Sequence, residues 1–179
     1  MIFFTADTHF CHISIINLCQ RPFANIEQMN EKLIENWNSR VKANDEIYIL
    51  GDFLYRGSGI DANNILAQLK GRKYLIKGNH DKFIDEKSFD KNHFIWIKDY
   101  HLLKWQKRKI ALFHYPIFEW DGYFTNDIHL YGHVHNSNND IEQQNRLKLL
   151  GKNAVNVGVD VNNFFPISID EIFKIVDTV

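Results

Sequence analysis

The stretch YLIKGNHDKF, residues 74–83, begins like a buried strand and ends like a binding loop. Its first three residues form a short apolar run, which is typical of a strand buried on both faces. The run stops at Gly78, and Asn79, His80 and Asp81 follow. Three consecutive polar side chains next to a buried strand need hydrogen-bond partners or a ligand. This strand end is therefore a candidate site.

Length and composition limit the class of protein. The 179 residues fit one domain, and we expect residues 1–179 to form it. Apolar residues make up 45% of the chain and aromatic residues 14%, enough for a buried core. No apolar run approaches the ~18 residues of a membrane helix, and the N-terminus lacks a secretion signal, so we expect no membrane partner and a cytoplasmic location. The net charge of −1 disfavours nucleic acid as a partner, and the sequence does not indicate an oligomeric state.

Short apolar runs alternate with longer amphipathic segments along the chain. We expect strands at residues 2–6, 46–50, 73–76, 109–113, 127–131 and 153–157. Apolar residues at helical spacing predict a helix between Asn25 and Val41, with Asn25 as N-cap. Further helices are expected at about 61–69 and after Ser168, where Glu171 completes a capping box. The pattern is that of an α/β protein, with residues 136–145 as its most loop-like stretch.

Side chains that bind metals follow five of the six expected strands. These strand ends read Asp7-Thr8-His9, Gly51-Asp52, Gly78-Asn79-His80-Asp81, His114 and Gly132-His133-Val134-His135. The carboxyl ends of strands in open α/β sheets form the edge where ligands bind, so residues far apart in sequence can meet there. One such ending is usually structural. Five endings, three of them with a glycine that permits a sharp turn, favour a shared site.

The donor atoms at these strand ends suit divalent metal ions. Two Asp, four His and one Asn offer nitrogen and oxygen without thiolate, which suits Mn, Fe, Zn, Co or Ni. Seven ligands exceed what one ion takes from a protein while leaving a position for substrate. With Asp52 as a bridge, two ions each have four protein ligands and keep open positions. The sequence therefore predicts two divalent ions, with Mn²⁺ as the first candidate.

The ordered series D-x-H, G-D, G-N-H-D, H and G-H-x-H, from Asp7 to His135, resembles the calcineurin-like metallophosphoesterase superfamily, especially its small bacterial single-domain members. The resemblance implies two stacked mixed β-sheets flanked by helices. It implies that the first metal is held by Asp7, His9, Asp52 and His135. It implies that the second is held by Asp52, Asn79, His114 and His133. The stretch Asn156 to Asp160 also resembles the closing strand of such members.

The resemblance implies hydrolysis of phosphate esters. Two divalent ions with two aspartates leave a charge of about +2, which suits a phosphate ester. The ions would clamp phosphate oxygens while a hydroxide bridging them attacks phosphorus. The family pattern does not assign His80 to a metal, so we expect it to protonate the leaving group, as the catalytic partner of Asp52. Asp81 would hold the loop or orient the His80 ring.

Four residues are expected to contact the substrate or to affect which substrates the protein accepts. Tyr55 stands where the protein-phosphatase branch, G-D-x-x-D-R-G, has its second aspartate, which disfavours protein substrates. Arg56 keeps its place and would bind phosphate or form a surface ion pair. His12 completes a D-x-H-x-x-H spacing that resembles small bacterial relatives, and it would reach the substrate. Asn79 would contact the substrate as well as a metal.

Several activities are compatible with these residues. A phosphodiesterase that acts on a small or nucleotide-type substrate is the leading hypothesis. A phosphomonoesterase is the alternative, because the same metals permit it. A nuclease is disfavoured by the balanced charge. An inactive metal-bound scaffold is disfavoured because all seven ligand positions and His80 are present.

Overall fold

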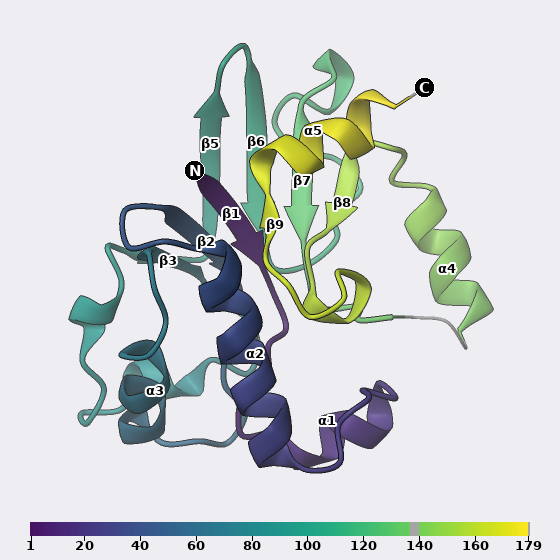
Figure 1. The fold of residues 1–179 in the computed structure, drawn as a ribbon. Helices are drawn as coiled ribbons and strands as arrows, with labels where there is room; N and C mark the ends of the chain where they lie inside the picture. The colour runs from purple at the N-terminus through teal and green to yellow at the C-terminus, as the bar shows by residue number, and fades with distance from the viewer. Residues whose placement is uncertain (137–139, 179) are drawn as a thin grey trace.

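Two β-sheets enclose a shared apolar core at the centre of the molecule (Figure 1). The computed structural model describes residues 1–136 and 140–178. The strands of the first sheet are β1 (Ile2–Thr5), β2 (Glu46–Leu50), β3 (Arg72–Ile76), β4 (Ile97–Lys98) and β9 (Ile167–Ser168). The strands of the second are β5 (Tyr100–Trp105), β6 (Arg108–Phe113), β7 (Ile128–Tyr131) and β8 (Ala154–Asn156).

Both sheets mix parallel and antiparallel pairs. The first has the order β4-β3-β2-β1-β9, in which only β9 runs antiparallel to its neighbour. The second has the order β5-β6-β7-β8, in which only β5 is antiparallel. In Figure 1 the arrowheads of β1, β6 and β7 point toward the same end of the molecule. The predicted pair of stacked mixed sheets is confirmed, and strands from both sheets end where a site can form.

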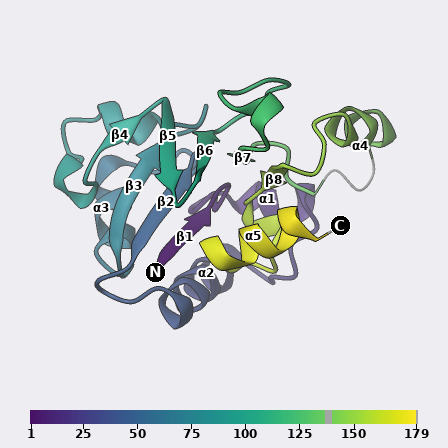
Figure 2. The same ribbon diagram turned by 90° about the horizontal axis from the view of Figure 1, so that it is seen from above.

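Within the described residues, five α-helices accompany the sheets: α1 (Ile13–Leu18), α2 (Ile26–Arg40), α3 (Gly59–Leu66), α4 (Ile141–Lys148) and α5 (Ile169–Asp177). The Asn25 side chain caps α2 by accepting from Gln28 N at 2.8 Å, as predicted. None of the helices in this part of the chain is both long and apolar enough to cross a bilayer. Seen from above (Figure 2), β1 to β3 lie between β5 and β6 on one side and α2 on the other.

Alternating side chains divide the first sheet between two cores, as the two-residue period of a strand requires. Phe3, Ile49 and Leu75 face the helices, where they join Met29, Leu33 and Trp37 of α2 in one cluster. Phe4, Tyr48, Leu50, Tyr74 and Ile76 face the second sheet. Both faces of this sheet are buried, which explains why its strands are continuous apolar runs.

The expected elements differ from the structure in six places. Every expected strand is present with its ends moved by one residue at most, but the short β4 and β9 and the edge strand β5 were not predicted. The predicted helix 61–69 begins at Gly59 because Ser58 and Asp61 form a capping box. Helix α1 was not predicted. Part of the predicted loop 136–145 is helical, since Asp140 caps α4, and residues 137–139 lie outside the described residues.

The capping box of α5 predicts a pH-dependent contribution to stability. Glu171 Oε2 accepts from Ser168 N at 2.8 Å and from its Oγ at 2.7 Å, and it pairs with Arg40 at 2.6 Å. Burial acts against these partners, but together they lower the pKa of Glu171 from 4.5 to about 2. A carboxyl group with a lowered pKa stabilises the fold fully above its unfolded value, and the contribution is lost as the pH falls toward 2.

We therefore expect Glu171→Gln to lower the free energy of unfolding by about 1 kcal/mol at pH 7, and by less at pH 3.5. Urea unfolding at the two pH values measures both. Glu35, which pairs with Lys32 on an exposed surface, is the control, and Glu35→Gln should change little. An equal penalty for Glu171→Gln at both pH values would contradict this explanation.

Candidate metal centre

The carboxyl ends of strands from both sheets bring the predicted ligands together. Loops that lie 126 residues apart in sequence touch directly, because His133 N donates to Asp7 Oδ1 at 3.0 Å and Oδ2 at 2.9 Å. Asp7 follows β1 in the first sheet and His133 follows β7 in the second. This contact places the two sheets' strand ends at one edge, as the convergence predicted from the sequence requires.

Asp52 lies at the centre of this edge, and it is 2% exposed. Its Oδ1 accepts from His80 N at 2.9 Å. Its Oδ2 faces three imidazole Nε2 atoms, those of His114 at 3.5 Å, His9 at 3.6 Å and His80 at 3.9 Å. These separations exceed a normal hydrogen bond. Two atoms that bind one ion at ~2.1 Å lie roughly 3.0 to 3.5 Å apart, so Asp52, His9 and His114 are spaced like ligands of shared ions.

The ligand atoms fall into two groups around Asp52. Atoms of Asp7, His9 and His135 lie within 4.8 Å of one another, and so do atoms of Asp52, His114 and His133. Asn79 joins the second group, since its Oδ1 is 3.1 Å from His114 Nε2. The structure thus brings together residues of each set that the family pattern implies, with Asp52 between the two groups.

Two buried polar groups show that the arrangement fits a cation. His9 is 2% exposed, and its Nε2 has no hydrogen-bond partner among the described residues. Burial lowers the pKa of His9 to about 2, so its ring is neutral, and in the tautomer with the proton on Nδ1 this Nε2 has a free lone pair. Asp7 is fully buried, and burial raises its pKa to about 7 although His135 and His114 oppose the rise. A divalent ion would satisfy both groups, because it accepts the lone pair and neutralises the carboxylate.

Hydrogen bonds at Nδ1 orient two of the imidazole rings, those of His114 and His135. His114 Nδ1 lies 2.8 Å from Leu50 O and donates to it, which leaves Nε2 as the acceptor nitrogen. His135 Nδ1 lies 2.7 Å from Asp160 Oδ2. Such carboxylate and carbonyl partners fix the tautomer of a metal-binding histidine. Nε2 is therefore the nitrogen that each ring would offer to an ion.

Arg21 connects this support to the first ligand loop. It is 4% exposed, and its Nε and Nη2 donate to the two oxygens of Asp160 at 2.7 and 2.9 Å. Nη2 also donates to Asp7 O at 2.7 Å, and Nη1 donates to Thr8 O at 2.9 Å. Arg21 thereby fixes both the backbone beside Asp7 and the carboxylate that orients His135. Arg21 belongs to none of the sequence motifs, and Asp160 stands out in the sequence only as the end of the family-like stretch from Asn156.

The ligand loops hold strained backbone conformations. Five of the seven predicted ligands have left-handed φ angles, namely Asp7 at 57°, His9 at 50°, Asp52 at 53°, His133 at 72° and His135 at 42°. Each costs about 1 to 3 kcal/mol in a residue other than glycine, and such strain gathers at functional sites. The surrounding structure must hold these residues in place.

Glycine and Asp81 make that close arrangement possible. A Cβ atom on Gly78 would lie 2.3 Å from Asp52 Oδ1, and one on Gly132 would lie 2.7 Å from Asp7 Oδ2. Asp81 accepts from the N–H groups of Asp52 at 2.9 Å, Phe53 at 2.8 Å and Gly78 at 2.8 Å. Asp81 therefore holds two loops together, which is the first of the two roles expected for it.

His12 lies beside His9, where it is 8% exposed. The two Nδ1 atoms are 3.3 Å apart, and the His12 ring stacks on Tyr55 with centroids 3.7 Å apart. If His9 Nε2 is an acceptor, its proton is on Nδ1 and is donated to His12 Nδ1. This geometry favours support of His9 over the predicted contact with substrate.

His80 and Arg56 remain accessible beside this core. The side chain of His80 is 37% exposed, and the Tyr55 ring packs edge-on against it with centroids 4.8 Å apart. The tyrosine that replaces the family's aspartate thus supports His80 by packing. Arg56 is exposed and lies over the Tyr55 ring at 5.2 Å, with no ion pair to any residue of the described ranges.

The role of Asp160 can be tested by metal binding. We expect Asp160→Asn to weaken the affinity for Mn²⁺ at one of two sites by about 10- to 100-fold, because His135 loses its charged partner. Calorimetric titration of metal-free protein measures both sites. Asp99→Asn is the control, since Asp99 pairs with Lys77 on the surface. Two sites of unchanged affinity in the Asp160 variant would contradict the orienting role.

Comparison with known proteins places this site in a family. The profile of the calcineurin-like phosphoesterases matches residues 1–107, more than half of the chain. An uncharacterized protein of Methanocaldococcus jannaschii is 34% identical over 181 residues, which cover 98% of this chain and 91% of that protein. The Gene 66 protein of Mycobacterium phage D29 is 35% identical over 83 residues, which cover 45% of this chain and 40% of that protein.

A solved structure is similar over nearly the whole chain. A protein of unknown function from Aquifex aeolicus superimposes with a TM-score of 0.74 at 30% identity, covering 97% of this chain and 98% of that one. The chain belongs to the calcineurin-like phosphoesterase family, and it is a metal-dependent phosphoesterase.

Proposed function

We propose that the protein hydrolyses phosphodiesters of small, nucleotide-type molecules with two divalent ions, of which Mn²⁺ is the first candidate. The observation that carries the proposal is the position of Asp52 Oδ2, which lies 3.5 to 3.6 Å from the Nε2 atoms of His114 and His9. One carboxylate oxygen between imidazoles of two ligand groups is the arrangement that a bridging ligand needs. The mixed nitrogen and oxygen donors suit Mn²⁺ and its neighbours in the transition series.

Each ligand in the proposal has one task. Asp7, His9, Asp52 and His135 hold one ion, and Asp52, Asn79, His114 and His133 hold the other. When bound, the two ions neutralise the phosphate and lower the pKa of water. The chain itself orients the ligands through Asp81, Arg21 and Asp160. His80 remains outside both sets and supplies the proton that the leaving oxygen takes.

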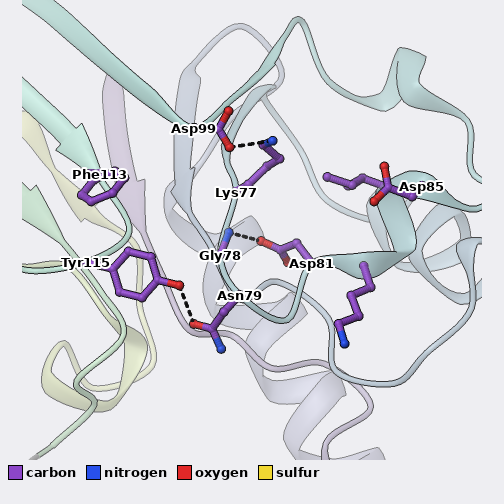
Figure 3. Close-up of a pocket in the computed structure, with 10 residues that line it drawn as sticks. Lys77, Gly78, Asn79, Asp81, Asp85, Asp99, Phe113 and Tyr115 are labelled. Atoms are coloured by element: carbon purple, nitrogen blue, oxygen red, sulfur yellow. Dashed lines mark hydrogen bonds and ion pairs between the residues drawn. The ribbon is translucent and has the colours of Figure 1, made fainter.

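Two cavities beside the centre support a diester as substrate. One of about 430 Å³ is bordered by Asn79, Tyr115 and Lys77, and Figure 3 shows the Tyr115 side chain directed at Asn79. Another of about 310 Å³ is bordered by His80 and Arg56. A phosphodiester has two substituents that need room, whereas a monoester has one. Hydrolysis of bis(p-nitrophenyl) phosphate faster than mono(p-nitrophenyl) phosphate with added Mn²⁺ is therefore expected, and the reverse order would favour a phosphomonoesterase.

The bridging role of Asp52 gives a first prediction. Asp52→Asn should lose metal occupancy and reduce turnover of bis(p-nitrophenyl) phosphate by about 10³-fold or more, because one residue serves both ions. Elemental analysis and initial rates measure the two effects. Asp85→Asn is the matched control, since Asp85 is an exposed acid that lines the larger cavity without being a predicted ligand. Full turnover in the Asp52 variant would exclude the bridge.

The role of His80 gives a second prediction. His80→Ala should retain both metals, and it should slow diesters with alkyl leaving groups by about 10²-fold or more, because an alkoxide needs a proton to depart. Nitrophenyl esters should lose far less, since nitrophenolate departs without one. The ratio of kcat/KM for the two ester types is the measurement. Equal losses on both types would remove His80 from the acid role.

A further inference from the structure

The cavity of about 310 Å³ lies beside the predicted proton donor. His80 forms part of its wall, together with Tyr55, Arg56, Lys82 and Glu86. The same His80 has its Nε2 3.9 Å from Asp52 Oδ2. The cavity therefore begins where the metal centre ends, and a group bound to the reacting phosphorus near His80 would extend into it.

The charges on the wall favour an anion. Neither Arg56 nor Lys82 forms an ion pair with any residue in 1–136 or 140–178. The one acidic wall residue, Glu86, is engaged elsewhere, since its Oε2 accepts from Gly59 N at 2.7 Å and from Ser88 Oγ at 3.2 Å. Two unpaired cations thus face the cavity, and a forked guanidinium beside an ammonium suits a phosphate group.

Two structural features describe the position of Arg56 beside the cavity. Its guanidinium lies over the Tyr55 ring at 5.2 Å, a cation–π distance. Its backbone has a left-handed φ of 55°, which is uncommon outside glycine. Because Tyr55 stands where the protein-phosphatase branch has an aspartate, no carboxylate at that position neutralises Arg56. The residue is held beside the cavity with its charge available.

The larger cavity in Figure 3 lacks this excess of positive charge. There Lys77 is paired with Asp99 at 2.6 Å, and Asp85 lies on the same wall. Lys82 borders both cavities, so it alone does not distinguish them. The preference for an anion belongs to the side that contains His80 and Arg56.

We infer that this cavity binds a phosphate group carried by the leaving alcohol, so that the substrate is a phosphodiester of a small phosphorylated alcohol. The inference rests on the proposed function, because His80 marks the side from which the leaving group departs. Water gives one proton to the solvent and its oxygen forms the new bond to phosphorus, while the bond from phosphorus to the alcohol oxygen breaks with its electron pair. That oxygen takes the proton of His80, and the phosphorylated alcohol is released.

A matched pair of synthetic esters tests the inference on the full-length, Mn²⁺-loaded enzyme. One is methyl 3-(phosphonomethyl)phenyl phosphate, whose phosphonate cannot be hydrolysed, and the other is methyl 3-methylphenyl phosphate. In both esters the phenol is the leaving group and the methyl group stays on phosphorus. The two esters therefore differ only in the charge that the leaving group carries. We expect the phosphonate ester to have a kcat/KM at least tenfold higher, and we expect this preference to shrink as salt screens the charges.

The variant Arg56→Gln/Lys82→Gln identifies the cavity. It should bring the ratio of kcat/KM for the two esters to within twofold of one, chiefly through a higher KM for the phosphonate ester. Lys87→Gln is the control, since Lys87 is an exposed cation of the same segment that does not line the cavity, and it should keep the preference. A circular dichroism spectrum like that of the wild type shows that the double variant is folded.

Each outcome bears on a separate claim. If the wild type hydrolyses both esters equally well, or if the double variant keeps the preference, the cavity does not bind the second phosphate, although the proposed phosphodiesterase stands. If the wild type hydrolyses neither ester, the proposed function fails, and the inference fails with it. A preference that is present in the wild type and lost only in the double variant supports both.

Discussion

The structure depends on a buried carboxylate that is held by backbone groups and faced by imidazoles. Asp52 is 2% exposed, and its Oδ1 is fixed by His80 N. Burial acts against ionisation, but His114 and the His80 N–H hold the pKa of Asp52 at about 2. Such a charge cannot remain in an apolar interior without compensation. Metal ions held between this carboxylate and the facing Nε2 atoms of His9 and His114 would supply that compensation.

Two sheets are needed to build this environment. The first delivers Asp7, Asp52 and Asn79, the second delivers His114 and His133, and the core between the sheets fixes their separation. Five ligands occupy left-handed backbone that would not persist in an isolated loop. The strain is maintained because the loops bind one another, as His133 N does with Asp7. The stability of the core thereby offsets the backbone strain of the ligand loops and keeps the candidate ligands in place.

Much of this was predictable from the sequence, and the reasons for the remainder are physical. Strand runs predicted where the strands lie, and the ordered polar endings predicted that the candidate ligands converge, because period and strand polarity are local properties. The two stacked sheets and the two ligand sets were implied by the family resemblance. Arg21 and Asp160 lie 139 residues apart, and only the fold reveals that they form a buried pair. His12 is predicted at the substrate from its spacing, and only the fold reveals that its ring also stacks on Tyr55 and contacts His9. The N-caps Ser58 and Asp140 fix where α3 and α4 begin, and apolar periodicity alone does not locate these two helix starts.

The central claim is that one carboxylate joins two ions in a single pocket. Anomalous diffraction from crystals grown with Mn²⁺ tests it most directly. Two peaks roughly 3.5 to 4 Å apart are predicted, with Asp52 in contact with both and with His9 and His114 on different ions. A single peak, or a pair in which Asp52 touches only one ion, would contradict the account.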